Sequence, residues 1–311
     1  MEFLEHAYSN IENMIEIKDI DFAYAGSSHC IFDGFSLSLE ANNIYGLLGK
    51  NGTGKSTLLY LISGLLRPQS GTVTIDGTKS SSRHADMLGD VFIVPEEFDL
   101  PAMTLDKYVE LNQPFYPRFS REVLDRCLAD FDLLLSLRLD RLSMGQKKKV
   151  YMSFALASGT LLLLMDEPTN GLDIPSKSQF RRVVMQNMTP DRTLVISTHQ
   201  VHDIEQLLNH IVIIDRSGML LNESVAGICR RYVFGLCKSG EEPQGVVYAE
   251  PTLMGNAFVA KRTEDMAETP LNLELLFNAV VDGAMNIDAE EEVSNKMIMK
   301  NEQLKDKETI Q

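Results

Sequence analysis

The sequence predicts an α/β fold in which a parallel sheet carries a phosphate-binding loop. Two observations predict this fold. The segment "NIYGLLGKNGTGKSTLLYLISGLL" is an apolar strand, a glycine-rich turn and a helix in direct succession. The segments "TLLLLMDEP" and "TLVIST" are short continuous apolar runs, which are typical of parallel strands that are covered on both faces. A chain of 311 residues, 44% of them hydrophobic, is long enough for one large domain and an accessory one.

The elements of the large domain follow from local patterns. Residues 14–24 and 31–39 alternate apolar and polar side chains, which predicts two strands. The helix after the glycine-rich turn is expected to end near Gly64, because Arg67-Pro68 prevents its continuation. "GTVTIDG" and "DVFIVP" predict two further strands. Helical periodicity replaces the strand pattern between Thr104 and Leu142.

The C-terminal part is less regular. "IVIID" and "GMLLNES" predict a closing hairpin, "GVVYAEP" and "NAFVAKR" predict two strands, and "TPLNLELLFNAVVDG" predicts one helix. The last residues are charged and lack a broad apolar face, so we expect disorder or a frayed helix there. The predicted organisation is a large domain at 14–220, a small accessory region at 221–283 and an acidic tail at 284–311.

Composition excludes several classes of function. The formal charge of −15 argues against binding to nucleic acid, whose backbone attracts positive charge. Four cysteines without metal-ligand or disulfide-framework spacing favour a reducing cytosol. The start "MEFLEHAYSN" has neither the basic residues nor the apolar run of a signal peptide. No apolar stretch approaches the ~20 residues of a membrane span, so any membrane role is expected to depend on a partner.

The glycine-rich turn "GKNGTGKS", residues 49–56, fits the phosphate-loop pattern G-x-x-x-x-G-K-[ST]. Its glycines let backbone N–H groups converge on a β-phosphate, Lys55 brings charge to the β/γ oxygens, and Ser56 offers a hydroxyl to Mg²⁺. The lysine-serine pair and the glycine spacing disfavour a dinucleotide site of the Rossmann type. The nucleotide-binding candidates here are Gly49, Lys50, Asn51, Gly52, Thr53, Gly54, Lys55, Ser56 and Thr57.

Two acidic residues end the strand in "LLLLMDEP". Asp166 is expected at the carboxyl end of that strand, where open α/β sheets bind their ligands, and it would hold Mg²⁺. Glu167 would orient and polarise an attacking water, the task that phosphoryl transfer leaves to a base. The alternative, a buried strand that merely ends in acids, loses weight once the phosphate loop is present.

Further short motifs follow in a fixed order: "LSMGQ", "NGLD" and "ISTHQ". With the two motifs above, they make the chain resemble the ATP-binding subunit of an ABC transporter over residues 14–220. The resemblance implies a phosphate-loop NTPase cassette with a RecA-like parallel-sheet core, N-terminal antiparallel strands and a helical subdomain at about 98–160. A small C-terminal α+β appendage completes the expected fold. The resemblance also implies that Tyr24 stacks on adenine, that His199 touches the γ-phosphate and that Asp173 lies in the loop linking the two halves of a dimer.

The resemblance gives "LSMGQ" a role in a dimer. Ser143 and the N–H of Gly145, with Gln146 beside them, would bind the γ-phosphate held by the phosphate loop of another subunit. Because the chain has one set of motifs and no internal repeat, the second set must come from a second copy or a related chain. The three lysines at 147–149 are expected to form a solvated helix face, with a smaller electrostatic role near phosphate as the alternative.

The chain departs from the pattern of the family at two positions and in one region. Met144 replaces the first glycine of the usual Leu-Ser-Gly-Gly-Gln. Glu96 stands where the family has a glutamine that reaches Mg²⁺; a carboxylate is a good hard-oxygen ligand, so the expected metal shell is Ser56, Glu96 and Asp166. The region after 222 weakly resembles the appendages of multidrug- and antibiotic-type exporter ATPases.

The function implied is Mg²⁺-dependent ATP hydrolysis by a dimer of cassettes, driving transport, with export favoured over import. The chain would act through a separate integral membrane permease, at the cytoplasmic face of the cell membrane. Two other classes stay open. One is a soluble cassette ATPase acting on a ribosome or chromosome, which the acidic charge and the absence of tandem cassettes and long coiled coils disfavour. The other is a nucleotide-binding regulator, which the presence of Glu167 and His199 disfavours.

Overall fold

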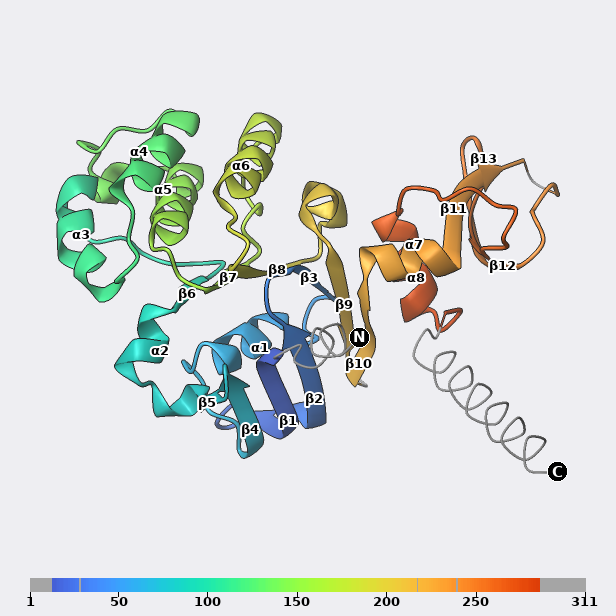
Figure 1. Ribbon diagram of the computed structural model, residues 1–311, viewed down its shortest axis with the longest axis horizontal. Coiled ribbons are helices and arrows are strands. Elements are labelled where there is room, and N and C mark those ends of the chain that lie inside the picture. Colours follow the sequence, from blue (N-terminus) through green and yellow to red (C-terminus); the bar gives the residue numbers. More distant parts are fainter. Residues whose placement is uncertain (1–12, 28, 217, 239, 286–311) are drawn as a thin grey trace, which may run out of the picture. The chain divides into compact units, whose positions relative to one another are not determined.

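The computed structural model describes residues 13–27, 29–216, 218–238 and 240–285 (Figure 1). The chain divides into two compact units, Met1–Met219 and Leu220–Gln311. Each unit is described by itself. The predicted tail at 284–311 lies outside the described residues from position 286 onward.

The sheet at the centre of the first unit has the order β10-β9-β3-β8-β7-β6. Strands β9 to β6 lie in the first unit and pair in parallel, and β10 begins at the end of that unit. All positions of β7 and β8 are buried, as the continuous apolar runs predicted. The register pairs Leu48 with Thr198 and Asp166 with Ser197, so the segments that follow β3, β7 and β8 leave the sheet at one edge. The strands are β3 (Ile44–Leu48), β6 (Val91–Val94), β7 (Leu162–Asp166), β8 (Thr193–Thr198), β9 (His210–Asp215) and β10 (Gly218–Ser224).

A second, four-stranded sheet of order β2-β1-β4-β5 is antiparallel. Helix α1 (Lys55–Ile62) contacts both sheets and buries Leu58 and Leu61 in one hydrophobic core that also contains Ile17 and Leu164. The phosphate loop at the start of α1 is therefore fixed by packing on two sides. The strands of this sheet are β1 (Asn13–Ala23), β2 (Cys30–Glu40), β4 (Ser70–Ile75) and β5 (Thr78–Lys79).

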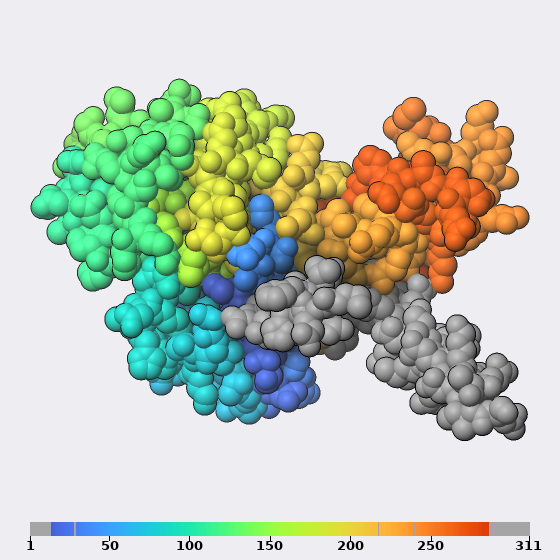
Figure 2. Space-filling view, viewed as in Figure 1, coloured from blue at the N-terminus to red at the C-terminus, as the bar shows by residue number. Residues whose placement is uncertain are grey.

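Helices surround the parallel sheet, and Figure 2 shows the surface of α3 to α5 (green) above that of α2 (cyan). Thr104, Ser120 and Ser143 cap α3, α4 and α5 with their hydroxyls, which accept orphan N–H groups of the first turn. The helices are α2 (Ala85–Gly89), α3 (Leu105–Asn112), α4 (Arg121–Asp130), α5 (Met144–Ala157) and α6 (Ile174–Asn187). Short 3₁₀ turns occupy Ser80–Ser82, Gln113–Phe115, Leu139–Arg141, Val201–Asp203 and Glu205–Leu207.

The second unit contains a three-stranded antiparallel sheet of order β11-β13-β12. Helix α8 packs on β13 and β12 with Leu276 and Ala279 buried. The predicted strand pair and helix are present, and the sequence analysis missed α7 and β11. The elements are α7 (Val225–Arg231), β11 (Tyr232–Cys237), β12 (Val246–Thr252), β13 (Gly255–Lys261) and α8 (Leu273–Val281).

Helix length and polarity decide whether a helix could cross a membrane. Across the ranges that the structure describes, every helix is too short or too polar to cross a bilayer.

Candidate nucleotide and metal site

The loop between β3 and α1 has a backbone that requires glycine. Gly52 and Gly54 have φ of +79° and +100°, in the left-handed region that favours glycine. A Cβ at Gly49 would lie 2.6 Å from both the Ile214 carbonyl oxygen and Thr53 Oγ1. These glycines let the chain turn closely at the start of α1, where the helix dipole favours an anion.

Lys55 lies inside this loop. Its Nζ donates to the carbonyl oxygens of Gly49, at 2.8 Å, and Lys50, at 3.3 Å. Burial lowers the pKa of Lys55, while the carboxylates of Glu167 and Asp166 act in the opposite direction. The ammonium group is thus a buried cation within the glycine-rich loop. A cation in this position is suited to bind phosphate oxygens.

Asp166 is buried at the end of β7. Its Oδ1 accepts a hydrogen bond from the hydroxyl of Ser197 on β8, whereas its Oδ2 is buried without a hydrogen-bond partner. An unpartnered buried carboxylate oxygen is costly unless a ligand or ion satisfies it. Oδ2 of Asp166 is therefore suited to bind a cation.

The donor set suits Mg²⁺. Ser56 and Glu96 line one cavity beside the phosphate loop, and both offer oxygen atoms. Within the described part of the chain, no three His, Cys, Asp or Glu side chains converge to hold a metal by themselves. Mg²⁺ is ordinarily bound by one or two carboxylates together with substrate phosphates and water, so such a site needs no cluster of three acids.

Glu167 and His199 are joined across the edge of the sheet. His199 Nδ1 lies 2.7 Å from Glu167 Oε1, and the hydroxyl of Thr198 donates to Glu167 Oε2 at 3.1 Å. Glu167 is buried, has a left-handed backbone with φ of +44°, and donates its N–H to the carbonyl of Ser197 at 3.0 Å. Both carboxylate oxygens are therefore held, and the imidazole has its Nε2 free of this contact.

Glu96 follows β6 and is also held. Asn170 Nδ2 donates to Glu96 Oε1 at 2.8 Å. The sequence analysis did not single out Asn170, although it lies within "DEPTNGLD" between Glu167 and Asp173. Its side chain lines the same cavity as Glu96.

Most of these groups line one cavity of about 630 Å³, although the predicted metal ligand Asp166 is not among its lining residues. Tyr24 stands at its wall, with its hydroxyl 3.0 Å from Thr57 Oγ1 and its ring edge-on to Phe22 at 5.1 Å between centroids. The structure thus brings together the predicted phosphate-loop, aromatic and acidic residues. The lining is Tyr24, Ile31, Asn51, Gly52, Gly54, Lys55, Ser56, Thr57, Glu96, Glu167, Asn170 and His199.

The residues of "LSMGQ" do not line this cavity. Ser143 is exposed and caps α5 in a capping box with Gln146, at 3.3 and 3.1 Å, and Gly145 lies beside the Gly171 carbonyl. Asp173 caps α6, and hydrogen bonds from Ser176 hold the pKa of its carboxyl below the usual range. The residues predicted to bind the γ-phosphate of another subunit therefore lie at the exposed start of α5, outside the nucleotide cavity.

The prediction that the three lysines form a solvated helix face is wrong. Lys148 is 3% exposed, and its Nζ donates to the carbonyl oxygens of Glu167, at 3.1 Å, and Asn170, at 2.8 Å. Lys149 Nζ donates to Gln179 Oε1 at 2.9 Å. Lys147 Nζ lies 3.7 Å from Asp99. Helical spacing could have predicted the burial of Lys148, because residue 148 shares a face with the buried residues 152 and 155.

Comparison with known proteins identifies relatives that bind ATP. The model of the ABC transporter family matches residues 32–170. The linearmycin resistance ATP-binding protein LnrL of Bacillus subtilis is 30% identical over 224 residues, 70% of this chain and 71% of that protein. The arabinose import ATP-binding protein AraG 2 of Burkholderia ambifaria is 30% identical over 242 residues, 73% of this chain and 46% of that protein.

A solved structure has the same fold. It is a dimeric ATP-binding cassette in a post-hydrolysis state with ADP and Pi, with 24% identity and a TM-score of 0.60 over 68% of this chain and 98% of that one. The extent of the likeness to LnrL and the match of the family model together decide the family. The chain belongs to the ABC transporter family, as an ATP-binding subunit with ATPase activity.

Proposed function

We propose that two cassettes, this chain and a second copy or a related one, close around two ATP molecules and drive export through a separate transmembrane subunit. The observation that carries the proposal is the separation of two half-sites within one chain. The phosphate loop, Glu96, Glu167 and His199 share a cavity, whereas Ser143 and Gly145 form an exposed helix start outside it. A second chain would bring its own helix start to the γ-phosphate.

The residues of the cavity support hydrolysis. The loop N–H groups and Lys55 would hold the β- and γ-phosphates, and Tyr24 would stack on the adenine. Glu167, held by His199 and Thr198, would orient the attacking water and accept its proton. The Nε2 of His199, pointing away from Glu167, would contact the γ-phosphate. Mg²⁺ bound by Ser56, Asp166 and Glu96 would neutralise charge on the phosphate oxygens.

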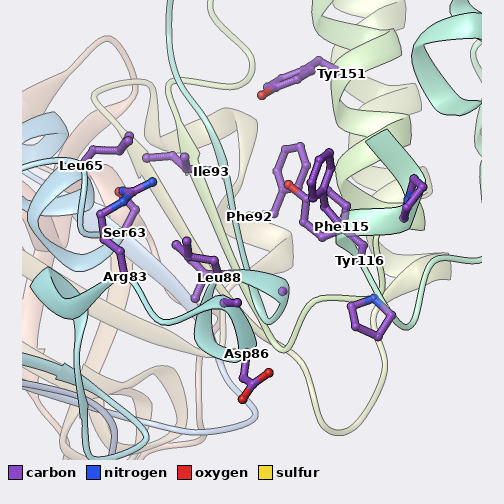
Figure 3. A pocket seen from close by; sticks show the side chains of 15 residues that line it. Ser63, Leu65, Arg83, Asp86, Leu88, Phe92, Ile93, Phe115, Tyr116 and Tyr151 are labelled. Atoms are coloured by element: carbon purple, nitrogen blue, oxygen red, sulfur yellow. The ribbon is translucent and has the colours of Figure 1, made fainter. Parts of the chain in front are cut away.

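A groove in the first unit supports a membrane partner (Figure 3). It has a volume of about 610 Å³, and the rings of Phe92, Phe115 and Tyr116 gather along one part of it. Phe115 is 70% exposed, which is unusual for so large an apolar side chain. The groove would receive a cytoplasmic helix of the transmembrane subunit. It includes Phe92 and Ile93 of β6, the strand that leads to Glu96, so a partner seated there would lie close in sequence to the metal site.

The direction of transport rests on likeness to relatives. LnrL is a resistance protein and AraG 2 is an import protein. We favour export because the chain covers most of LnrL but less than half of AraG 2. The place of work would be the cytoplasmic face of the membrane, reached through the transmembrane subunit.

Trapping of the closed dimer tests the proposal. Glu167→Gln keeps the size of the side chain and removes the charge that activates water, so ATP should stay bound and shift the protein from monomer to dimer on size exclusion. Adding Ser143→Arg should abolish the shift, because a bulky group then occupies the place of the γ-phosphate on the facing chain. The same run without ATP is the matched control, at protein concentrations high enough for a weak dimer. Unchanged ATPase activity in Ser143→Arg, alone and with the transmembrane subunit, would contradict the proposal.

A further inference from the structure

The geometry points to Lys148 as a positioning residue that ties helix α5 to the catalytic site of its own chain. Through two main-chain carbonyls and one side-chain amide, it holds Glu167 and Glu96 in place together. The inference rests on the roles that the proposed function gives to these two residues. It concerns a lysine that does not itself line the nucleotide cavity but bonds to the main chain of two residues that do, Glu167 and Asn170.

The first link runs from Lys148 to the segment after β7. Lys148 lies in the first turns of α5, and its Nζ reaches the carbonyl oxygens of Glu167 and Asn170. Asn170 also donates its N–H to the Glu167 carbonyl at 3.1 Å, so the two residues close a turn. Glu167 begins this turn with the strained left-handed backbone, which the surrounding contacts must hold. The ammonium group bridges both ends of the turn.

The second link runs from the same turn to Glu96. Asn170 accepts from Lys148 with its carbonyl and donates to Glu96 Oε1 with its side-chain amide. Lys148, Asn170 and Glu96 thus form a continuous hydrogen-bonded path between α5 and the segment after β6. Loss of the lysine would loosen both the catalytic carboxylate and the carboxylate proposed to reach Mg²⁺.

Charge gives the path a second role. Lys148 is buried, and burial lowers the pKa of its ammonium group, while the surrounding carboxylates, Glu96 foremost, act in the opposite direction. A buried cation such as that of Lys148 is tolerated when an anion lies near it. Asn170 bonds to both Lys148 and Glu96, so the hydrogen-bonded path brings the two charges near each other, and a chain with glutamate at position 96 gains from a lysine at position 148. Neutralising Lys148 alone should leave the charge of Glu96 unbalanced. Neutralising Glu96 as well should remove that imbalance.

The path also connects the two half-sites of one chain. The start of α5 is the part that would meet ATP bound to the facing cassette, and Lys148 lies one turn further along the same helix. A shift of α5 on meeting that ATP would move the lysine that holds the chain's own Glu167. Lys148 lies outside the cavity lining, so ATP binding to the chain's own phosphate loop should not depend on it.

The experiment compares Lys148→Met with Lys149→Met in the full chain. Lys149 is the matched control, a neighbouring α5 lysine bonded to Gln179 instead of the site. We expect kcat to fall about tenfold or more in Lys148→Met, with the Kd for ATP, measured by fluorescence titration with Mg²⁺, within about twofold of the native value. Lys149→Met should stay within about twofold for both. A kcat in Lys148→Met equal to that of Lys149→Met would overturn the inference.

A double-mutant cycle separates positioning from a structural role. Lys148→Gln alone should lower kcat about fivefold or more, and adding Glu96→Gln should restore part of the loss, since the unbalanced charge is gone. Additive losses would overturn the charge pairing. Insolubility of both Lys148→Met and Lys148→Gln, with Lys149→Met soluble, would assign Lys148 to the fold and overturn positioning.

One further outcome distinguishes this inference from the proposed function. An active Lys148→Met with an inactive Ser143→Arg would reject only the inference. An active Ser143→Arg would reject the proposed dimer itself.

Discussion

His199 Nδ1 and Glu167 Oε1 lie 2.7 Å apart across the ends of β8 and β7. The contact orients a carboxylate that would otherwise be held only by Thr198 and its own backbone. His199→Ala should therefore lower kcat about a hundredfold, in the range expected for loss of acid–base positioning, while ATP binding changes less than about threefold. Steady-state kinetics and nucleotide titration measure the two effects. His202→Ala, at an exposed position nearby, is the control, and equal kcat in both variants would contradict the role of His199.

Lys55→Ala should abolish nucleotide binding. The substitution removes the only side-chain cation proposed to face the β- and γ-phosphates and leaves the carbonyls of Gly49 and Lys50 without its ammonium group. Equilibrium binding of a fluorescent ATP analogue gives the readout, with exposed Lys18→Ala as the control. Normal hydrolysis by Lys55→Ala would show that the phosphate loop has been misassigned.

Position 96 should tolerate an amide better than a methyl group. Glu96→Gln keeps an oxygen that can accept from Asn170 and reach Mg²⁺, so it should retain a substantial part of the basal turnover. Glu96→Ala removes that oxygen and should lose more, about tenfold, with a higher Mg²⁺ concentration at half-maximal rate. Titration of ATPase activity with Mg²⁺ makes the comparison. Equal rates in the native protein and both variants would contradict a role of Glu96 at the metal, and the exposed Glu97 would be tested next.

Phe115→Asp should weaken binding to the transmembrane subunit without lowering basal ATPase activity. A charge in the groove opposes burial of an apolar partner surface, and Phe115 is not among the residues that line the nucleotide cavity. Recovery of the membrane subunit with the tagged chain in mild detergent is the measurement. Leu111→Asp, exposed on α3 but outside the groove, is the control. Equal recovery with both variants would place the partner elsewhere.

Thiol labelling should distinguish the cysteines. Cys127 is buried in α4, and burial raises its pKa to about 12, so at pH 8 it has almost no thiolate and no access to reagent. Cys30 is exposed. N-ethylmaleimide should modify Cys30 in the folded protein and reach Cys127 only after denaturant is added, as read by peptide mass. Labelling of Cys127 at the rate of Cys30 would contradict the packing of α4.

The sequence predicted an element correctly where a short local pattern is tied to one backbone conformation. The continuous apolar runs predicted β7 and β8 because strands buried on both faces need no polar positions. The phosphate-loop pattern predicted the strand–turn–helix that surrounds Lys55, because its glycines meet backbone angles that other residues avoid.

Other features depend on contacts between distant segments. Lys148 looked like part of a charged run, and only packing of α5 against the turn after β7 buries it. Asn170 bonds to Glu96, 74 positions earlier in the chain, and no local pattern encodes such a pairing. Strand β11 was missed for a different reason, since "YVFGLC" lacks alternation and contains glycine.

The left-handed backbone of Glu167 has a consequence for how such a chain drifts over time. On grounds of stability alone, glycine or asparagine would suit a φ of +44° better than a longer side chain does. If Glu167 activates the attacking water as proposed, we expect glutamate to persist at such a position only while turnover is under selection. A lineage that kept the cassette but gave up hydrolysis should lose its glutamate early, and the replacements should favour small residues that ease the turn. On that proposal, we expect the residue at 167 to distinguish cassettes that hydrolyse ATP from cassettes that have lost hydrolysis.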